Sequence, residues 1–343
     1  MSRTVLPLVV GVVVSIASTA SGQLTRVSCF GINFEGQCNV PPDLGLVLKV
    51  AAGSYHTLAL RADGTIIGWG ENSYGQCVPP AGIGPAVDIA AGRYHSLALL
   101  ANGTVVGWGS SEDGASQPPS DLGHCIAIAA GDQFSAAVRI DNVVRCWGSN
   151  SHGQCSPPPD YGPMVAVACG VYHTVGLQAD GAVRVWGDNQ FGQRNVPSDL
   201  PTIVAISSTG SHTVALTWDG KVRAWGANTY GECIAPWSMP PAVAVAAGQG
   251  HTVAVLEDGS IRCWGNNWYG QCTVAYSGDD LAALLGSWGS KGSAWDLDGD
   301  GVVGGGDLAM LLAGWGAAYG KGSTMGPVIS VSAVVHTAVV SVP

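Results

Sequence analysis

An acidic segment near the C-terminal end of the chain has the residue types and spacing of a calcium-binding loop. It runs for twelve residues from Asp296 to Asp307. An EF-hand-type loop needs carboxylates at its positions 1, 3, 5 and 12, a glycine at position 6 and a backbone carbonyl at position 7. These positions are held by Asp296, Asp298, Asp300, Asp307, Gly301 and Val302, and Gly304 leaves room for a water ligand. The alternative is an ordinary acidic turn, but the complete spacing favours one bound Ca²⁺.

Five histidines recur at equivalent places along the chain instead of gathering in one motif: His56, His95, His173, His212 and His251. Each is followed by Thr or Ser, and Phe134 stands at the one place where the histidine is missing. Catalysis needs unlike groups that converge, so we predict a structural hydrogen bond inside each unit and assign no catalytic residue. A carboxylate pair assembled from different units stays open, and enzyme activity is therefore left undecided, with a non-enzyme favoured.

Three cysteine pairs share one spacing, with eight residues between partners: Cys29/Cys38, Cys146/Cys155 and Cys263/Cys272. The first member never occurs without the second, which predicts three disulfides and an oxidising compartment. The other cysteines are Cys77, Cys125, Cys169 and Cys233, which either stay buried thiols or pair across units. A metal site on cysteine is not expected, because no Cys-x-x-Cys motif is present.

The elements that must position these residues belong to a repeat of 39 residues. Trp-Gly dipeptides mark it at Trp69, Trp108, Trp147, Trp186, Trp225 and Trp264, and Phe30-Gly31 stands one step earlier. Within a unit, a Gly comes first and is followed by a strand that begins with His-Thr. An Asp-Gly or Asn-Gly pair comes next and predicts a tight hairpin turn with positive φ at both central residues. The second strand of the hairpin ends at the Trp. Gly-Gln and a Pro-rich crossover complete the unit. About 40 residues with roughly four short strands is the size of one propeller blade.

These residues carry a family resemblance. The pattern G-x-x-H-T-x-A-L-x-x-D-G-x-V-x-x-W-G-x-N-x-x-G-Q resembles the repeat of the regulator of chromosome condensation family, over about residues 24–276. The resemblance implies an all-β fold, a seven-bladed β-propeller. The chain departs from the family pattern after Gly-Gln, where Cys usually replaces an apolar residue.

Positions that vary between units are the candidates for binding a partner. They fall in two loops per unit, and aromatic or arginine side chains in loops on a rigid scaffold are typical anchors. The candidates are Tyr55, Tyr74, Arg93, Tyr94, Tyr172, Phe191, Tyr230, Trp268 and Tyr269. The alternative for each aromatic residue is packing at the end of a blade.

Closure of the ring needs a seventh blade, of which the N-terminal half-unit around Phe30 supplies only one strand. The tail segment 332–340 resembles the segment 52–60 of the first unit. We therefore expect this tail to pair with residues 27–30 and complete the ring, since free sheet edges are a liability. The alternative is a disordered apolar tail.

The segment around the calcium loop repeats itself with a shift of 27 residues, as Asp280-Leu281 and Trp288-Gly289 match Asp307-Leu308 and Trp315-Gly316. This plan of two short helices is similar to a type I dockerin, over about residues 277–317. The resemblance implies an α-helical, EF-hand-like calcium module that docks on a cohesin-like or cell-surface anchor. The first loop, 269–280, lacks the early carboxylates, so one ion is expected. Gly305 and Gly306 stand where dockerins usually carry recognition side chains.

The ends and the charge of the chain bear on its location. Arg3, the apolar run 5–16 and the small residues up to Gly22 predict a signal peptide over residues 1–22. The domains expected after it are the propeller (23–276), the calcium module (277–317) and a tail (318–343). No later apolar run is long enough for a transmembrane helix.

A net charge of −10 without a Lys/Arg cluster excludes nucleic-acid binding.

Two functions follow from these expectations. The first is a secreted or cell-surface propeller that binds a protein and is attached through its calcium module. The second is a carbohydrate-binding protein or a polysaccharide-degrading glycosyl hydrolase, because dockerins usually tag that machinery. Clustered exposed aromatics with two facing carboxylates would favour the second.

Overall fold

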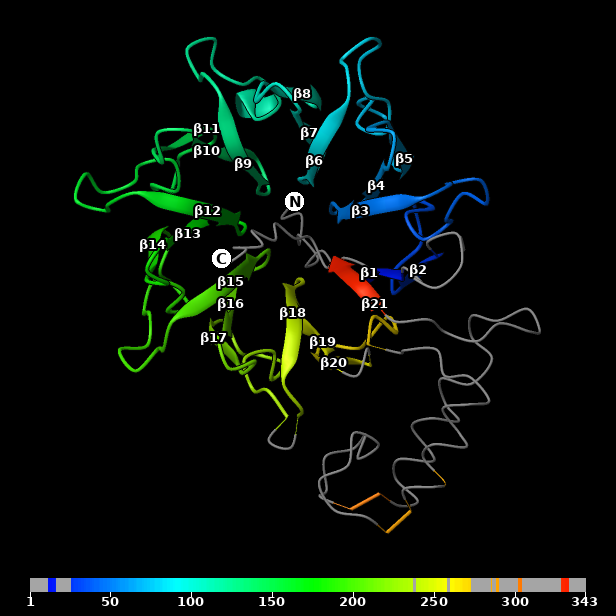
Figure 1. The fold of residues 1–343 in the computed structure, drawn as a ribbon, viewed down its shortest axis with the longest axis vertical. Coiled ribbons are helices and arrows are strands. Elements are labelled where there is room, and N and C mark those ends of the chain that lie inside the picture. Colours follow the sequence, from blue (N-terminus) through cyan, green and yellow to red (C-terminus); the bar gives the residue numbers. More distant parts are fainter. Residues whose placement is uncertain are drawn as a thin grey trace, which may run out of the picture.

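A computed structural model describes residues 12–16, 26–236, 239–257, 260–272, 285, 288–289, 302–303 and 328–332. Its regular structure is almost entirely β, and one short 3-10 helix, η1 (Glu112–Gly114), interrupts a loop. Each 39-residue repeat forms a three-stranded antiparallel sheet, and the sheets are arranged as blades around an axis (Figure 1). The all-β propeller expected from the repeat is confirmed.

Each repeat contributes an inner, a middle and an outer strand, in chain order. The inner strands are β3 (Val47–Ala52), β6 (Ala86–Ala91), β9 (Cys125–Ala130), β12 (Met164–Cys169), β15 (Ile203–Ser208) and β18 (Ala242–Ala247). The middle strands are β4 (His56–Arg61), β7 (His95–Leu100), β10 (Phe134–Arg139), β13 (His173–Gln178), β16 (His212–Thr217) and β19 (His251–Leu256). The outer strands are β5 (Ile66–Gly70), β8 (Val105–Gly109), β11 (Val144–Gly148), β14 (Val183–Gly187), β17 (Val222–Gly226) and β20 (Ile261–Gly265).

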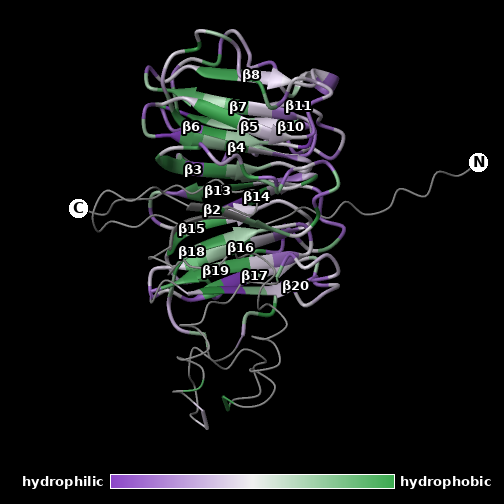
Figure 2. Ribbon diagram, turned by 90° about the vertical axis from the view of Figure 1, so that its right-hand side faces the viewer, coloured by the Kyte–Doolittle hydropathy of each residue, from purple (hydrophilic) through white to green (hydrophobic). Residues whose placement is uncertain are grey.

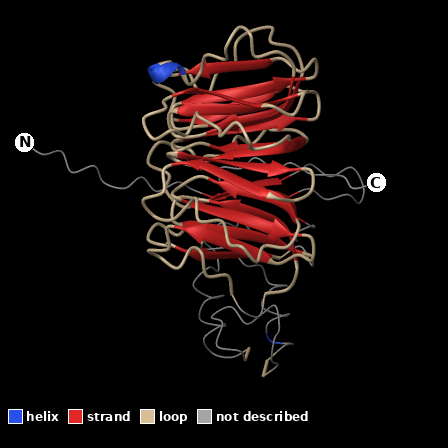
Figure 3. Cartoon of the chain, turned by 90° about the vertical axis from the view of Figure 1, so that its left-hand side faces the viewer, coloured by secondary structure: helices blue, strands red, loops and turns tan. Residues whose placement is uncertain are grey.

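The core lies between neighbouring blades. Middle strands are buried on both faces, as in β7, where all six residues are buried, and this explains their continuous apolar pattern. Inner strands end in small residues such as Ala51 and Ala52, because the blades crowd together near the axis. Apolar residues follow the strands and polar residues occupy mostly the loops (Figure 2). Loops lie at both ends of the stacked strands, and η1 lies at one of these ends (Figure 3).

The hairpin turns differ from the expected two-residue form. Within the described residues, positive φ occurs only at the second residue of each turn, as at Gly64 (+81°) and Asn142 (+65°). The preceding Asp63 instead accepts a hydrogen bond from the Thr65 N–H at 2.9 Å. A turn followed by one left-handed residue is the usual geometry of a slightly longer hairpin. The prediction of positive φ at both central residues was therefore wrong.

The fourth strand of each blade is also absent from the described repeats. The crossover segments that follow the outer strands, such as Pro79-Pro80, are not strands. Proline has no N–H and cannot join a hydrogen-bonded ladder, which limits the sheet to three strands.

The recurring Trp, Thr or Ser, and His residues of the repeat tie each blade to its neighbour. Trp69 Nε1–H and the Thr57 hydroxyl both donate to the carbonyl of Gln37, at 2.9 and 3.0 Å, in the preceding unit. In the other direction, His56 Nε2 lies 2.9 Å from Ser96 Oγ in the following blade. The same His-to-hydroxyl contact joins His95 to Ser135, His173 to Thr213 and His212 to Thr252. The expected hydrogen bond inside each blade is thus a hydrogen bond between blades.

A seventh three-stranded sheet is assembled from distant parts of the chain. It contains β1 (Val12–Ile16), β2 (Arg26–Phe30) and β21 (Val328–Ser332), in the order β2-β1-β21. The described tail strand pairs with β1. The segment 332–340, which was expected to pair with residues 27–30, lies outside the described residues except for Ser332, so that prediction stays untested. β1 itself falls within the predicted signal peptide. Val27 packs with the first repeat and Phe30 with the sixth, so β2 lies between these blades.

The calcium module lies mostly outside the described residues, including Asp296, Asp298, Asp300 and Asp307. Val303 is fully buried, and its carbonyl accepts the Gly289 N–H at 2.8 Å. Val302, whose carbonyl is the expected ligand at position 7, is 36 % exposed.

Candidate partner-binding face

Two loops of every repeat meet at the same end of the blades. One joins the inner to the middle strand, and the other follows the outer strand. Because the outer strand runs antiparallel to the middle one, its last residue Gly70 lies opposite His56. The Glu71 N–H donates to the Tyr55 carbonyl at 3.0 Å and ties the two loops together. All the variable loops consequently share one face, and the hairpin turns lie on the opposite face.

Side-chain hydrogen bonds hold these loops in shape. In the first repeat, Asn72 Oδ1 accepts the Cys77 N–H at 2.8 Å, and Gln76 Oε1 accepts the Tyr74 N–H at 3.1 Å. Equivalent bonds recur in other repeats, such as Asn228 with the Cys233 N–H at 2.9 Å. The loop aromatics are therefore presented by a preorganised backbone, which lowers the entropic cost of binding a partner.

Aromatic side chains of adjacent units pair across the blade boundaries on this face. Tyr55 stacks on Tyr94 with ring centroids 5.1 Å apart, and Tyr74 lies 5.3 Å from Tyr94. Three further pairs are His152–Tyr172 at 4.2 Å, Tyr230–Trp268 at 5.3 Å and Phe34–Tyr269 at 6.4 Å. We call these residues, together with Phe191, the aromatic loop face.

The aromatic candidates chosen from the sequence all belong to this face. The most exposed of them are Trp268 (71 %), Phe191 (55 %) and Tyr74 (54 %). Tyr55 and Tyr94 are partly buried by their stacking, and burial raises the pKa of Tyr55 to about 12. Phe34, which is 80 % exposed, was missed. Its position in the loop after Phe30-Gly31, the half-unit's counterpart of Trp-Gly, was the signal that could have found it.

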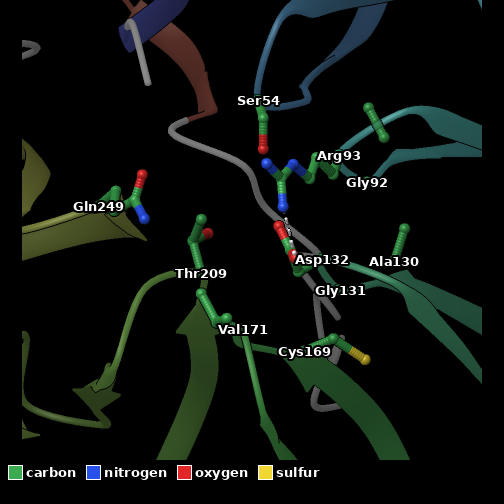
Figure 4. A pocket seen from close by; sticks show the side chains of 11 residues that line it. Ser54, Gly92, Arg93, Ala130, Gly131, Asp132, Cys169, Val171, Thr209 and Gln249 are labelled. Atoms are coloured by element: carbon green, nitrogen blue, oxygen red, sulfur yellow. Dashed lines mark hydrogen bonds and ion pairs between the residues drawn. The ribbon is translucent and has the colours of Figure 1, made fainter. Parts of the chain in front are cut away.

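A charged pair lies in a small pocket among the inner-to-middle loops. Arg93 Nη1 lies 3.4 Å from Asp132 Oδ2, and Ser54, Thr209 and Gln249 also line the pocket (Figure 4). The pKa of the Asp132 carboxyl is raised by burial, an effect that the Arg93 guanidinium opposes. The cavity encloses only ≈ 20 Å³, room for about one water molecule. The cavity is therefore too small for a small-molecule substrate.

Two of the three predicted disulfides are present, Cys29–Cys38 and Cys263–Cys272. The third is not: Cys146 and Cys155 are free thiols. The two thiols are hydrogen-bonded, and this contact together with burial raises the pKa of Cys146 well above its usual value. Cys77, Cys125, Cys169 and Cys233 are also free.

The described residues contain no group of three or more His, Cys, Asp or Glu side chains that could hold a metal ion. In that part of the chain, no helix is long and apolar enough to cross a membrane.

Comparison with known proteins identifies the repeat. The family model for the regulator of chromosome condensation (RCC1) repeat matches six segments, at residues 47–76, 86–115, 125–154, 164–193, 203–232 and 242–271. Each segment runs from the inner strand to the loop that carries the Gly-Gln pair or its equivalent. Among curated proteins, no relative matches the chain.

Solved structures share the fold at low sequence identity. Prp20p from Saccharomyces cerevisiae is 20 % identical with a TM-score of 0.59, over 78 % of this chain and 82 % of its own. The CRINKLY ectodomain of the Arabidopsis thaliana receptor kinase ACR4 is 21 % identical with a TM-score of 0.61, over 76 % and 97 %. Human WBSCR16 is 24 % identical with a TM-score of 0.62, over 73 % and 85 %.

Proposed function

Since the chain belongs to the RCC1 repeat family, we propose that it is a protein-binding propeller that recognises its partner through the aromatic loop face. One observation carries the proposal: exposed aromatic residues from neighbouring blades pair on a single face, on loops held by hydrogen bonds. Large aromatics that lose little conformational freedom on binding are the usual anchors of protein interfaces.

Relatives of known structure support a protein partner. The structure of yeast Prp20p was described together with its binding to Gsp1p and histones, and another structure shows it bound to Kap60. These partners belong to Prp20p. What is carried over to this chain is the use of an RCC1-type propeller as a platform for proteins.

The proposed place of action is outside the cytoplasm. The segment 1–22 has the charge, apolar run and small residues of a signal peptide, and two disulfides in the propeller suit an oxidising compartment. Detection of the mature chain in the secreted or envelope fraction, with mass spectrometry showing loss of residues 1–22, would support export.

The calcium module is the proposed means of attachment. Its donor set of four carboxylates and the Val302 carbonyl fits a hard cation such as Ca²⁺. Gly289 donates to the Val303 carbonyl, so the middle of the loop is tied to the preceding segment. Calorimetry should show uptake of one Ca²⁺ that is lost in Asp298→Ala and kept in Asp279→Ala, a control in the same module. Equal Ca²⁺ uptake by the two variants would show that the loop 296–307 is not the calcium site.

The binding face is tested by paired substitutions. Tyr74→Ala and Trp268→Ala should each weaken partner binding by about 2 kcal/mol, or roughly thirtyfold, if they are anchors. Trp218→Ala is the matched control, because Trp218 is 69 % exposed and lies on the hairpin-turn face. Equal loss from all three variants would contradict the assignment of the face. A glycan array run in parallel would reveal the carbohydrate alternative, for which the same exposed aromatics could serve.

A further inference from the structure

A cavity of ≈ 410 Å³ lies where the chain crosses from β11 of the third repeat to β12 of the fourth (Figure 1). It is lined by the hairpin turn of the third repeat, by the crossover segment 157–163 and by Trp186 of β14. The hairpin turn places it on the face opposite the aromatic loop face. Its volume lies in the range of about 300–1,000 Å³ that is usual for small-molecule sites.

The lining of this cavity is mostly apolar. The buried side chains of Met164 and Trp186 belong to it. Four more of its residues are prolines of the crossover: Pro157, Pro158, Pro159 and Pro163. Asp141 carries the only charge among the described residues of the lining, and Arg139 Nη2 lies 3.0 Å from its carboxylate. Because a charge that leaves water needs an opposite charge nearby, this balanced site favours an uncharged ligand.

The two aromatic residues of the lining offer a ligand their rings and not their polar groups. Tyr161 O–H donates to the Val185 carbonyl at 3.2 Å, and Trp186 Nε1–H donates to the Gln154 carbonyl at 2.9 Å. A polyproline peptide has no internal hydrogen bonds, so any carbonyl that it buried here would need a donor that these residues lack. The apolar C–H face of a sugar ring needs no donor, and it packs against the electron-rich face of an aromatic ring.

One side-chain amide at the cavity is free to bind a ligand. Asn142 lines the cavity from the hairpin turn, where its φ is +65°. Its backbone is held in place, because its N–H donates to the Arg139 carbonyl and its carbonyl accepts the Met164 N–H, both at 2.9 Å. Its side-chain amide has no hydrogen-bond partner among the described residues. A carboxamide both donates and accepts, so it can pair with the N–H or the carbonyl of an amide group in a ligand.

Asn142 and Tyr161 both depart from the pattern of the repeat. The five other turns have Gly at the place of Asn142, and the crossover residues that correspond to Tyr161 are Ile83, Leu122, Leu200 and Met239. At the crossing from the second repeat to the third, a cavity of ≈ 520 Å³ has Leu122 and His124 at the places of Tyr161 and Pro163. The scaffold therefore requires neither Asn142 nor Tyr161, and side chains that a rigid scaffold does not require are available for recognition.

We propose that this cavity binds a neutral 2-acetamido sugar. The apolar face of the sugar ring packs on Tyr161, the acetyl methyl group lies among the crossover prolines, and the Asn142 amide pairs with the acetamido group. Such a sugar combines an apolar ring face, a methyl group and one amide, which are the three features that the lining complements. Its hydroxyls stay in water, because Asp141, Val143 and Pro163 of the lining are exposed to solvent. The site is separate from the aromatic loop face, so the chain can hold a glycan on one side and a protein on the other.

Titration of the full chain with N-acetylglucosamine, followed by calorimetry or NMR, tests the proposal. A ligand of this size is expected to bind with a Kd of about 1 mM. Glucose has the same ring without the acetamido group. It should bind at least about tenfold more weakly, because one hydrogen bond and one buried methyl group are lost.

Substitutions toward the neighbouring repeats assign the site. Tyr161→Leu should weaken binding at least about tenfold, whereas Tyr161→Phe keeps the ring and should bind the sugar as the wild type does. Asn142→Gly should weaken binding about fivefold or more through the loss of one hydrogen bond. His124→Ala, in the cavity of the preceding crossover, is the matched control and should leave the Kd unchanged. Tyr161→Leu and Asn142→Gly should both fold, since Leu122 and Gly103 stand at the equivalent places.

Three results would each overturn the proposal. They are a lack of saturation at about 10 mM N-acetylglucosamine, an equal affinity for glucose, and a Kd that Tyr161→Leu leaves unchanged. A polyproline peptide that binds in place of the sugar, and whose binding is lost in the same variants, would also overturn it by assigning the cavity to a peptide. If Tyr161→Leu does not fold, Asn142→Gly decides, since Gly adopts a positive φ without strain.

Discussion

Acidification should destabilise this propeller through its buried histidines. All five repeated histidines are buried, and burial lowers the pKa of His56 and His212 to about 3 and that of His95, His173 and His251 to about 4. In the unfolded chain the histidine pKa is near 6.5. The unfolded state therefore binds more protons than the folded state at every pH between these values, and stability falls as the pH falls below about 6.5.

The magnitude follows from this interval. At about pH 5 each histidine lies roughly 1.5 pH units below its unfolded pKa, which costs about 2 kcal/mol. Five such groups cost on the order of 10 kcal/mol, as large as the whole stability of a typical domain. Carboxyls with a lowered pKa, such as Asp63 beside Thr65, add their effect only at lower pH. Asp132, whose pKa is raised by burial, acts in the opposite sense.

Urea unfolding measured at several pH values between about 8 and 5 provides the assay. We expect a plateau above about pH 6.5 and a steep loss below it. His95→Phe is the matched variant, because Phe134 fills the same position in the third repeat and is fully buried. This variant should reduce the slope of the unfolding free energy against pH, measured below about pH 6.5, by about 1.4 kcal/mol per pH unit, which is the contribution of one histidine. Stability that stays constant down to about pH 5, or an unchanged slope in His95→Phe, would refute the reasoning.

Three further outcomes are expected from the scaffold. Ser96→Val should lower the free energy of unfolding by about 1–3 kcal/mol because it leaves His56 Nε2 without its hydrogen-bond partner. Ser96→Thr keeps the hydroxyl and should change the stability little. Thermal unfolding of the two variants should therefore give a lower Tm for Ser96→Val than for Ser96→Thr. Gly53→Ala should lower the free energy of unfolding by several kcal/mol, on the order of 3 or more, because its Cβ would overlap the Gly92 carbonyl and lie 2.6 Å from His56 Cε1. Gly75→Ala, which has open space around the new Cβ but a φ of +78°, should lower it by about 1 kcal/mol. An equal loss of Tm in the two variants would contradict the packing argument. Reducing both disulfides should cost about 2–3 kcal/mol each, as a loop of this length predicts, and a Tm unchanged by reductant would show that they contribute nothing.

Much of the scaffold could be predicted because the repeat shows its constraints six times. The Trp of the outer strand, the positive φ at Gly64 and the alternation of strands and turns recur at fixed positions of the unit, so the 39-residue period reveals them. The partner of each histidine could not be predicted in the same way. His56 bonds to Ser96, but a hydroxyl also follows every histidine in its own strand, so the period fits a bond within or between blades equally well.

The contacts on the aromatic loop face could not be predicted from the sequence for the same reason. Variable aromatics in two loops were visible, but their pairing across blade boundaries depends on how blades pack. Phe34 escaped notice because its unit is incomplete and has Phe30 in place of the Trp. The bonding state of Cys146 and Cys155 was hidden as well, because spacing shows that two cysteines can meet but not whether they are oxidised.

The most direct test of the account is site-specific photo-cross-linking in the living cell. A photoreactive residue at Tyr74 samples the aromatic loop face, and one at Trp218 samples the hairpin-turn face with similar exposure. The account predicts that the Tyr74 probe captures one protein identified by mass spectrometry, and that Trp268→Ala in the same chain reduces the yield. Capture of the same protein by the Trp218 probe alone, or a Tyr74 yield unaffected by Trp268→Ala, would contradict the proposed binding face.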